Sequence, residues 1–270
     1  MTKPFIGMTE RGDAGINHIW AEKIKNPNCA GAILITKAIW NKLFRQKALT
    51  ALQLKPIIIH AGITGWGNTK MEPFVPKYEN SIEAVRELID SGFPADHIVL
   101  RVDPIYPTDE GIERATNVIK MAKAIIPDVK RIRISIYDDY HNAREEILRR
   151  GFPAIDSITK WKNETERRPT PEQVDRVAKA LIAVRPDQVY ECCAEPEIAK
   201  AYPDHFVWTG CLSKKDCDIM HITVPEGTTI NNQQRFGCRC LSLKRELLSE
   251  RKRCAHNCAY CYWATKLNNE

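Results

Sequence analysis

The sequence predicts an α/β fold, a partial six-unit βα (TIM-like) barrel with a cysteine-rich C-terminal extension. Six short apolar runs alternate with stretches of helical periodicity, and nine of the ten cysteines lie between residues 192 and 261. Such alternation is typical of repeated βα units built on a parallel sheet. We expect residues 1–200 to form the partial barrel and residues 201–270 to form a cysteine-rich segment that folds back on the barrel mouth.

The predicted strands contain β-branched runs that suit burial on both faces of a parallel sheet. They span residues 4–9, 31–36, 56–64, 98–103, 132–138 and 188–194. Five predicted helices follow the first five strands and a sixth precedes the last strand, at 14–26, 37–52, 80–91, 110–126, 141–150 and 171–185. Thr170-Pro171-Glu172 opens the sixth helix with an N-cap residue and a first-turn proline.

Two observations favour a barrel over an open doubly wound sheet, which is the alternative. The first strand runs into TERGDAG (9–15), which lacks the glycine-rich phosphate loop of a dinucleotide-binding sheet. In a barrel, polar residues at the ends of the strands converge on one mouth, where the active sites of such folds lie. The residues in question are Glu10, Arg11, Asp13, Thr36, Lys37, His60, Thr64, Arg101, Asp103, Asp138, Asp139 and Glu195.

Composition excludes several classes of protein. With 270 residues, 43% of them apolar and 27% charged, the chain can bury a core and is not mainly disordered. It has no apolar run long enough to span a membrane, and its first 15 residues lack a signal-peptide core. We therefore expect a cytoplasmic protein without a membrane partner, in which clustered cysteines bind metal rather than form disulfides.

The last cysteines form a compact motif. Cys254, Cys258 and Cys261 have C-x3-C-x2-C spacing, followed by Tyr262. Three thiolates on one loop can bind three irons of a [4Fe-4S] cluster and leave the fourth iron open. The alternative is a zinc ion, with His256 or a distant cysteine as its fourth ligand.

The motif, with an aromatic residue directly before the third cysteine, resembles the signature of the radical S-adenosylmethionine (SAM) superfamily. CAHNCAYCYW (254–263) is especially similar to the spore photoproduct lyase branch. The superfamily's core is a partial barrel of six βα units, but its cysteines usually follow the first strand. The C-terminal position resembles an uncharacterised bacterial and phage family, a domain of unknown function, as do RGD (11–13), ILITKAI (33–39), ITGWG (63–67), RVDPI (101–105), CAE (193–195), Cys211 and GCRC (237–240).

This resemblance implies a radical SAM enzyme. Cys254, Cys258 and Cys261 would bind the catalytic [4Fe-4S] cluster, and its open iron would bind the amino and carboxylate groups of SAM. An electron from a reductant such as flavodoxin or ferredoxin would then yield methionine and a 5'-deoxyadenosyl radical, which abstracts hydrogen from a substrate. The likeness to a DNA repair enzyme implies a nucleobase in nucleic acid as that substrate, through lesion repair or base modification; a small metabolite or a peptide is the alternative.

The remaining cysteines suggest a second metal site. Cys193, Cys211 and the tight pair Cys238 and Cys240 offer four ligands for an auxiliary iron-sulfur cluster or a structural zinc ion. Unliganded thiols are the alternative. Neighbouring residues of a strand point to opposite faces, so only one of Cys192 and Cys193 is expected to face the mouth.

Other residues at the strand ends are candidates for catalysis or cofactor binding. Arg101 and Asp103 lie two residues apart on one face of a strand, and with His60 they are the catalytic candidates. A local ion pair and a core histidine are the alternatives. The cofactor-binding candidates are Glu195, Tyr260, Thr36 and Lys37, of which Tyr260 belongs to the motif and Glu195 resembles the glutamates that hold the SAM amino group.

The C-terminal segment is also basic, with eight Lys and Arg against three Glu from residue 231 onward. Lys244, Arg245 and residues 251–253, with Tyr262 and Trp263, would give a basic, aromatic rim that suits a phosphate-bearing substrate. The alternative is one amphipathic helix over LSLKRELLSERKR (241–253) with its leucines inward. A zinc-stabilised nucleic-acid-binding protein, or an iron-sulfur electron carrier or sensor that does not bind SAM, are the competing functions.

Overall fold

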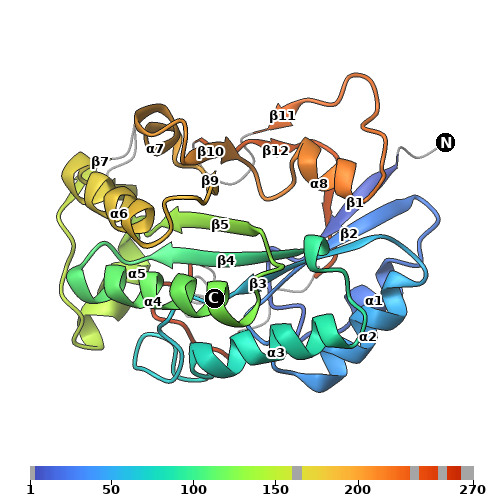
Figure 1. Ribbon diagram of the computed structural model, residues 1–270, viewed down its shortest axis with the longest axis horizontal. Coiled ribbons are helices and arrows are strands. Elements are labelled where there is room, and N and C mark those ends of the chain that lie inside the picture. Colours follow the sequence, from blue (N-terminus) through green and yellow to red (C-terminus); the bar gives the residue numbers. More distant parts are fainter. Residues whose placement is uncertain (1–3, 160–165, 232–236, 249–253, 263–270) are drawn as a thin grey trace.

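An eight-stranded parallel sheet forms the centre of the computed structural model, which describes residues 4–159, 166–231, 237–248 and 254–262 (Figure 1). The strand order is β10-β9-β5-β4-β3-β2-β1-β13. The strands are β1 (Phe5–Met8), β2 (Cys29–Thr36), β3 (Ile57–Gly62), β4 (Ile98–Ile105), β5 (Arg131–Ile136), β9 (Tyr190–Cys193), β10 (Phe206–Thr209) and β13 (Lys244–Glu246). All six predicted strands are present, and the predicted α/β class with a parallel sheet is confirmed.

The helices connect these strands, and shorter elements complete the fold. The helices are α1 (Trp20–Lys23), α2 (Lys42–Leu52), α3 (Tyr78–Asp90), α4 (Asp109–Ile125), α5 (His141–Arg149), α6 (Pro171–Val184), α7 (Pro196–Ala201), α8 (Lys214–Ile219) and the 3-10 turn η1 (Ala95–His97). Two small antiparallel sheets contain β6 (Asp139–Tyr140), β7 (Ser157–Thr159) and β8 (Glu166–Pro169), and β11 (Ile230–Asn231) with β12 (Cys240–Leu241). Thr170 and Gln173 form the capping box that begins α6. No described helix is both long and apolar enough to cross a bilayer.

Two predicted helices are shorter than expected for a common reason. The carboxylate of Asp13 accepts hydrogen bonds from the backbone N–H groups of Gly15 and Lys37, at 2.8 and 2.6 Å. Both segments therefore leave their strands as turns. The helix expected over 14–26 is reduced to α1, and the helix expected from residue 37 begins only at Lys42, after the N-cap Asn41.

The two faces of the sheet have different coverings. Helices α1 to α4, α6 and α7 pack on one face, where residues such as Phe44, Leu88 and Leu181 bury the main core. The other face is covered by α8 and its flanking segments, with Leu212 and Met220 in contact with the sheet. Figure 1 shows α1 to α4 below the sheet and α8, β11 and β12 above it. Of the described residues after 200, β10 and β13 belong to the sheet itself, and α8 with its flanking segments covers one face.

The sheet is strongly curved, so that its two flanks meet at their carboxyl ends. Strands β1 and β10 are six positions apart in the order, which corresponds to about 29 Å in a flat sheet. Yet a carboxylate oxygen of Glu10, two residues after β1, lies within 4.8 Å of the sulfur of Cys211, two residues after β10. The curvature brings residues from both flanks into one site.

The basic C-terminal segment is not the amphipathic helix that was the alternative reading of 241–253. Lys244–Glu246 forms β13, which pairs in parallel with β1, while Cys240–Leu241 belongs to β12. Leu247 and Leu248 are buried, and Gly7 of β1 leaves room for the Leu247 side chain. The leucines of this segment pack from an extended chain against different parts of the core, Leu241 and Leu243 on one face of the sheet and Leu247 and Leu248 on the other. Residues 249–253 lie outside the described residues.

Candidate functional site

The terminal motif lies against loops at the carboxyl ends of β1 to β3. His256 Nε2 lies 2.9 Å from Asp13 Oδ2, and the Ala259 N–H donates to the carbonyl of Met71 at 2.9 Å. Asn257 has a φ of 49°, a left-handed conformation that asparagine tolerates better than most residues. The loop bearing Cys254, Cys258 and Cys261 is therefore docked at the carboxyl ends of these strands by both side-chain and backbone contacts.

Asp13 is the buried anchor for this docking. Besides the backbone of residues 15 and 37, it accepts a hydrogen bond from the Thr36 hydroxyl at 2.5 Å and faces His256. Burial alone would raise the pKa of Asp13, but the hydrogen bonds from His256, Thr36 and Lys37 outweigh it and lower the pKa. Thr36, a predicted cofactor-binding residue, uses its hydroxyl here and is 1% exposed. Its observed contacts position Asp13.

Glu72 links the motif to two strand ends. Its buried carboxylate accepts hydrogen bonds from Thr64 at 2.7 Å, from Lys37 at 2.9 Å and from the Tyr260 hydroxyl. The Lys37 ammonium also lies 5.4 Å from the centre of the Tyr260 ring. Burial opposes the charge of Lys37, but Glu72 outweighs it, and Cys258 adds to the effect, so that the pKa of Lys37 is raised. The predicted cofactor residues Lys37 and Tyr260 are thus brought together by Glu72, which the sequence analysis missed.

The three motif thiols are close enough to one another and to Lys37 to interact electrostatically. Cys258 is buried and interacts electrostatically with Cys254, Cys261 and Lys37. A single tetrahedral zinc ion would hold its sulfur ligands about 3.8 Å apart. These three cysteines are not in the group of described metal-ligating side chains whose atoms all lie within 4.8 Å of one another. At least two of these three sulfurs are therefore more than 4.8 Å apart.

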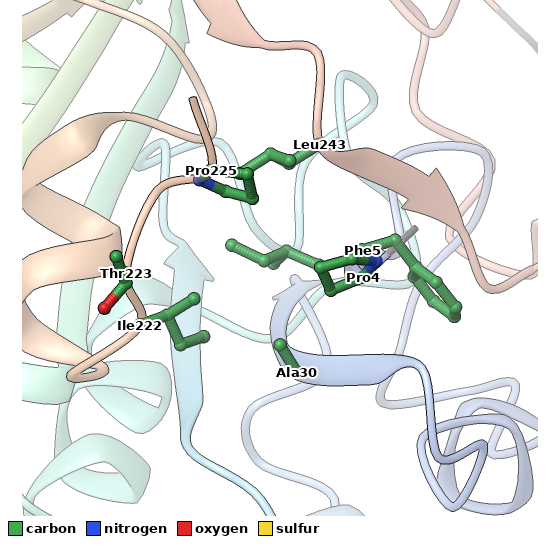
Figure 2. A pocket seen from close by; sticks show the side chains of 8 residues that line it. Pro4, Phe5, Ala30, Ile222, Thr223, Pro225 and Leu243 are labelled. Carbon is green, nitrogen blue, oxygen red and sulfur yellow. The ribbon is translucent and has the colours of Figure 1, made fainter. Parts of the chain in front are cut away.

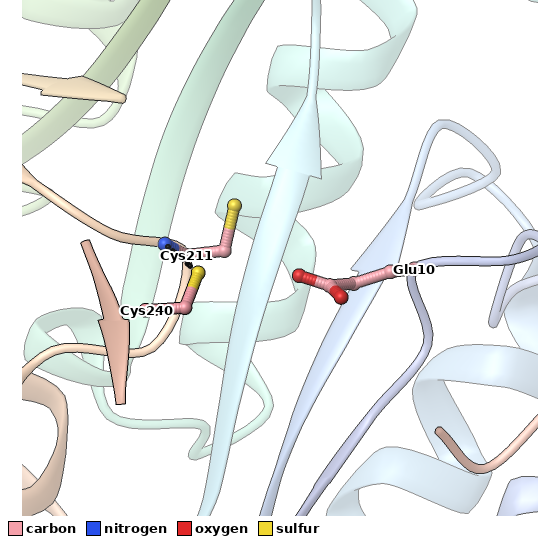
Figure 3. Close-up of side chains that lie close together, drawn as sticks. All are labelled: Glu10, Cys211 and Cys240. Atoms are coloured by element: carbon pink, nitrogen blue, oxygen red, sulfur yellow. Dashed lines mark hydrogen bonds between the residues drawn. The ribbon is translucent and has the colours of Figure 1, made fainter. Parts of the chain in front are cut away.

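The four cysteines predicted for a second site also come together; we call them, with Glu10, the inner cysteine cluster. Cys193 ends β9, Cys211 follows β10, and Cys238 and Cys240 lie in the segment ending in β12. The sulfurs of Cys193 and Cys211 are 3.6 Å apart, and those of Cys238 and Cys240 are 3.1 Å apart. Figure 3 shows Glu10 directed toward Cys211 and Cys240.

Two local features build this cluster. A side chain at Gly210 would collide with the backbone of Arg239 and Cys240, so glycine permits the close approach of the two segments. Cys192 points to the opposite face, where its thiol donates to the carbonyl of Val207 at 3.3 Å. Cys192 and Cys193 therefore lie on opposite faces of the sheet, as their neighbouring positions in one strand predict.

Arg101 and Asp103 form the local ion pair that was the alternative to a catalytic role, with Arg101 Nε donating to Asp103 Oδ2 at 2.6 Å. Arg101 interacts electrostatically with Cys193 and Cys211, and Asp103 interacts with Lys37 and Tyr260. The structure thus joins the two sites through adjacent charged groups.

The third catalytic candidate, His60, is fully buried in β3. Its Nε2 lies 3.3 Å from Arg133 Nη1, and its Nδ1 has no hydrogen-bond partner among the described residues. Burial, with the nearby positive charge of Arg133, holds the pKa of His60 well below its usual value. The imidazole is therefore neutral near pH 7 and accepts a hydrogen bond from Arg133.

Glu195, predicted to bind the cofactor, lies just after β9. Its Oε1 accepts hydrogen bonds from the Ile136 N–H at 3.0 Å and from the Ser135 hydroxyl at 3.2 Å. The carboxylate is therefore fixed at the carboxyl ends of β5 and β9, on the same rim as the terminal motif.

A buried ion network underlies the site and was missed by the sequence analysis. Arg133 donates to Glu191 at 2.5 Å, Arg131 donates to Glu191 at 2.9 Å and to Asp216 of α8 at 2.7 Å, and all four side chains are at most 5% exposed. Arginines at alternate positions of RIRISI, residues 131–136, share one face of β5, and that periodicity was the available signal.

The two described cations of the basic segment, Lys244 and Arg245, differ in exposure. The Lys244 side chain is 6% exposed and bonds to Glu10 at 2.9 Å, while the Arg245 guanidinium lies 4.1 Å from the centre of the Phe5 ring. The expectation is wrong for Lys244, whose side chain is buried against Glu10 because β13 pairs with β1, whereas Arg245 is exposed. Tyr262 packs against the ring of Tyr140, 4.8 Å away, whereas residues 251–253 and Trp263 lie outside the described residues.

A small apolar hollow lies at the other end of the sheet (Figure 2). Its volume of about 20 Å³ holds roughly one water molecule. It is lined by Pro4, Phe5, Ile6, Ala30, Ile222, Thr223, Pro225 and Leu243. None of the cysteines borders it, and it is too small for a cofactor.

These features define an α/β protein with a curved parallel sheet and two groups of cysteines at the carboxyl ends of its strands. Residues 16–263 match the family described as domain of unknown function (DUF1848), and the chain belongs to that family. The matched range contains both groups of cysteines. A search of curated proteins finds no match to the chain.

Proposed function

We propose that this protein is a radical SAM enzyme built on a partial six-unit βα barrel, in which Cys254, Cys258 and Cys261 bind a [4Fe-4S] cluster. The observation that carries the proposal is the C-x3-C-x2-C motif docked at the carboxyl ends of β1 to β3. Active sites of βα barrels lie at that end. The curvature that joins the flanks of the sheet supports the barrel interpretation.

The chemistry of the proposal comes from its cofactors, which the protein binds and orients. A reduced cluster would supply the electron that cleaves SAM to methionine and a 5'-deoxyadenosyl radical. Asp13 and Glu72 fix the loop that bears the cysteines, through His256 and Tyr260 respectively. Lys37 places a positive charge beside Cys258 and offsets the negative charge of the thiolates.

The rim supplies candidate groups for the rest of SAM. The oriented carboxylate of Glu195 is suited to bind an amino group, and a carboxylate oxygen of Asp103 is suited to accept a hydrogen bond from a ribose hydroxyl. Tyr260 offers an aromatic ring for adenine, with its hydroxyl held by Glu72. Arg101 acts by orienting Asp103, and the neutral His60 lies deeper, against Arg133.

The substrate class that we propose is a nucleobase in DNA or RNA. Support comes from the likeness of the terminal motif and from the cations at 251–253 together with the exposed Arg245, since Lys244 is paired with Glu10 within the fold. A base in a duplex would have to be extruded to reach the site. The proposal also requires a reducing, cytoplasmic setting and a small electron donor such as flavodoxin or ferredoxin.

Electron paramagnetic resonance of the reduced protein tests this function. After anaerobic reconstitution with iron and sulfide and reduction with dithionite, we expect the signal of a reduced [4Fe-4S] cluster that changes when SAM is added, because SAM binds the open iron. Full-length protein with Cys254, Cys258 and Cys261 all replaced by alanine is the control and should lack the SAM-sensitive signal. A cluster signal indifferent to SAM would indicate an electron carrier, and a colourless zinc protein would indicate a metal-stabilised binding module; either result contradicts the proposal.

A further inference from the structure

We propose that the inner cysteine cluster binds one zinc ion, with Cys211, Cys240 and Glu10 as ligands and one flanking thiolate, from Cys193 or Cys238, as the fourth. This centre is separate from the terminal motif and does not depend on SAM chemistry. The sequence alone is compatible with an iron-sulfur cluster, a zinc ion or free thiols at this site, and the proposal selects the single zinc ion.

The distances favour a single ion. One carboxylate oxygen of Glu10 and the sulfurs of Cys211 and Cys240 all lie within 4.8 Å of one another (Figure 3). Cys193 adds a sulfur 3.6 Å from that of Cys211, and Cys238 adds one 3.1 Å from that of Cys240. Tetrahedral zinc separates its thiolate ligands by about 3.8 Å, and it accepts both cysteine sulfur and glutamate oxygen. An [Fe4S4] cube would require these sulfurs to move apart in a packed interior.

Burial and charge support a bound cation. The four cysteines are at most 6% exposed, and the Glu10 side chain is 6% exposed. A buried carboxylate such as that of Glu10 is stable inside a protein only when it is paired with a cation or bound to metal. Lys244 lies against Glu10, and Arg101 Nη1 is buried without a hydrogen-bond partner among the described residues, close enough to Cys211 to interact electrostatically. A metal-bound thiolate would accept a hydrogen bond from Arg101 Nη1.

The proposed ligands come from segments that lie far apart in the sequence. Glu10 follows β1 on one flank of the sheet, Cys193 ends β9 and Cys211 follows β10 on the other, and Cys240 belongs to the covering layer. One ion would therefore hold the curved sheet and its C-terminal covering layer together. Binding requires no redox step: each ligating thiol releases one proton as its sulfur bonds to Zn²⁺.

Metal analysis of the full-length chain tests this site apart from the terminal motif. The background protein carries Cys254→Ala, Cys258→Ala and Cys261→Ala, so failure of the radical SAM proposal does not affect the result. We expect one tightly held zinc per chain, lost on Cys211→Ala with Cys240→Ala and retained on Cys29→Ala. Cys29 is a matched control because it is also buried, and its thiol donates a hydrogen bond to the carbonyl of Gly31.

Cobalt substitution keeps the proposal falsifiable if the double variant does not fold. Co²⁺ in the background protein should give the intense visible bands of a tetrahedral thiolate site. Glu10→Gln, which keeps every sulfur, should shift those bands and weaken zinc retention at least tenfold against a competing chelator. An unchanged spectrum and affinity in Glu10→Gln, a four-iron cluster with sulfide in the background protein, or no bound metal would each overturn the proposal.

Discussion

Replacing Cys258 by alanine should abolish the reductive cleavage of SAM and remove most of the reconstituted terminal-site iron, while the eight-stranded sheet stays folded. The motif offers three thiolates for three irons, and Cys258 is the buried member of the set beside Lys37. Its loop contacts the mouth through Asp13 and Met71, contacts that the substitution leaves in place. Iron content and absorbance near 400 nm measure the loss of the cluster. Far-ultraviolet circular dichroism measures whether the sheet stays folded.

The matched control for this experiment is Cys29→Ala, which removes a buried thiol from β2 far along the chain from the motif. It should retain iron and SAM cleavage. Undiminished cleavage in Cys258→Ala would contradict the assignment of the cluster ligands. Loss of zinc and of tail structure, with no iron bound by the parent protein, would favour the structural zinc interpretation of the motif.

Replacing Arg133 by alanine should cause the largest loss of stability, about 3–5 kcal/mol, because it leaves buried acids without their counter-charge. Arg133 is 0% exposed and donates to Glu191 at 2.5 Å, while Asp216 of α8 lies 3.5 Å away. Arginine charge also holds the pKa of Glu191 below its usual value against the opposing effect of burial. The network joins β5, β9 and α8, so we expect the free energy of unfolding in urea to fall by this amount.

The comparison variant is Arg86→Ala, which removes an exposed ion pair with Asp90 on α3. Surface pairs of this kind contribute little, so its unfolding midpoint should stay close to that of the parent protein. A loss below about 1 kcal/mol in Arg133→Ala would show that Arg131 alone compensates Glu191 and Asp216.

The sheet was predictable where its strands are buried on both faces. Runs such as ILIT in β2 and IIIH in β3 are apolar regardless of which face each residue meets, so local composition identifies them. Strands β10 and β13 have four and three residues, and β13 carries two basic residues and an acid, KRE. Its position is set by pairing with β1, which lies more than 230 residues earlier, and no local pattern encodes that.

The same limit explains which site residues were found. The cysteines stand out by type and spacing, so both groups were identifiable before the fold. Glu10 and Glu72 are ordinary acidic residues whose partners, Lys244 and Tyr260, are 234 and 188 positions away. Their roles arise from the curvature of the sheet and from the return of the chain to its mouth.

Detection of 5'-deoxyadenosine tests the central claim most directly. Anaerobically reconstituted protein, reduced with dithionite and given SAM, should release 5'-deoxyadenosine and methionine, measured by chromatography, and the Cys254, Cys258 and Cys261 triple-alanine variant should release none. Formation of 5'-deoxyadenosine that depends on these cysteines is the result we predict. No cleavage by a protein that holds its full complement of iron and sulfide would contradict the assignment of radical SAM chemistry to this site.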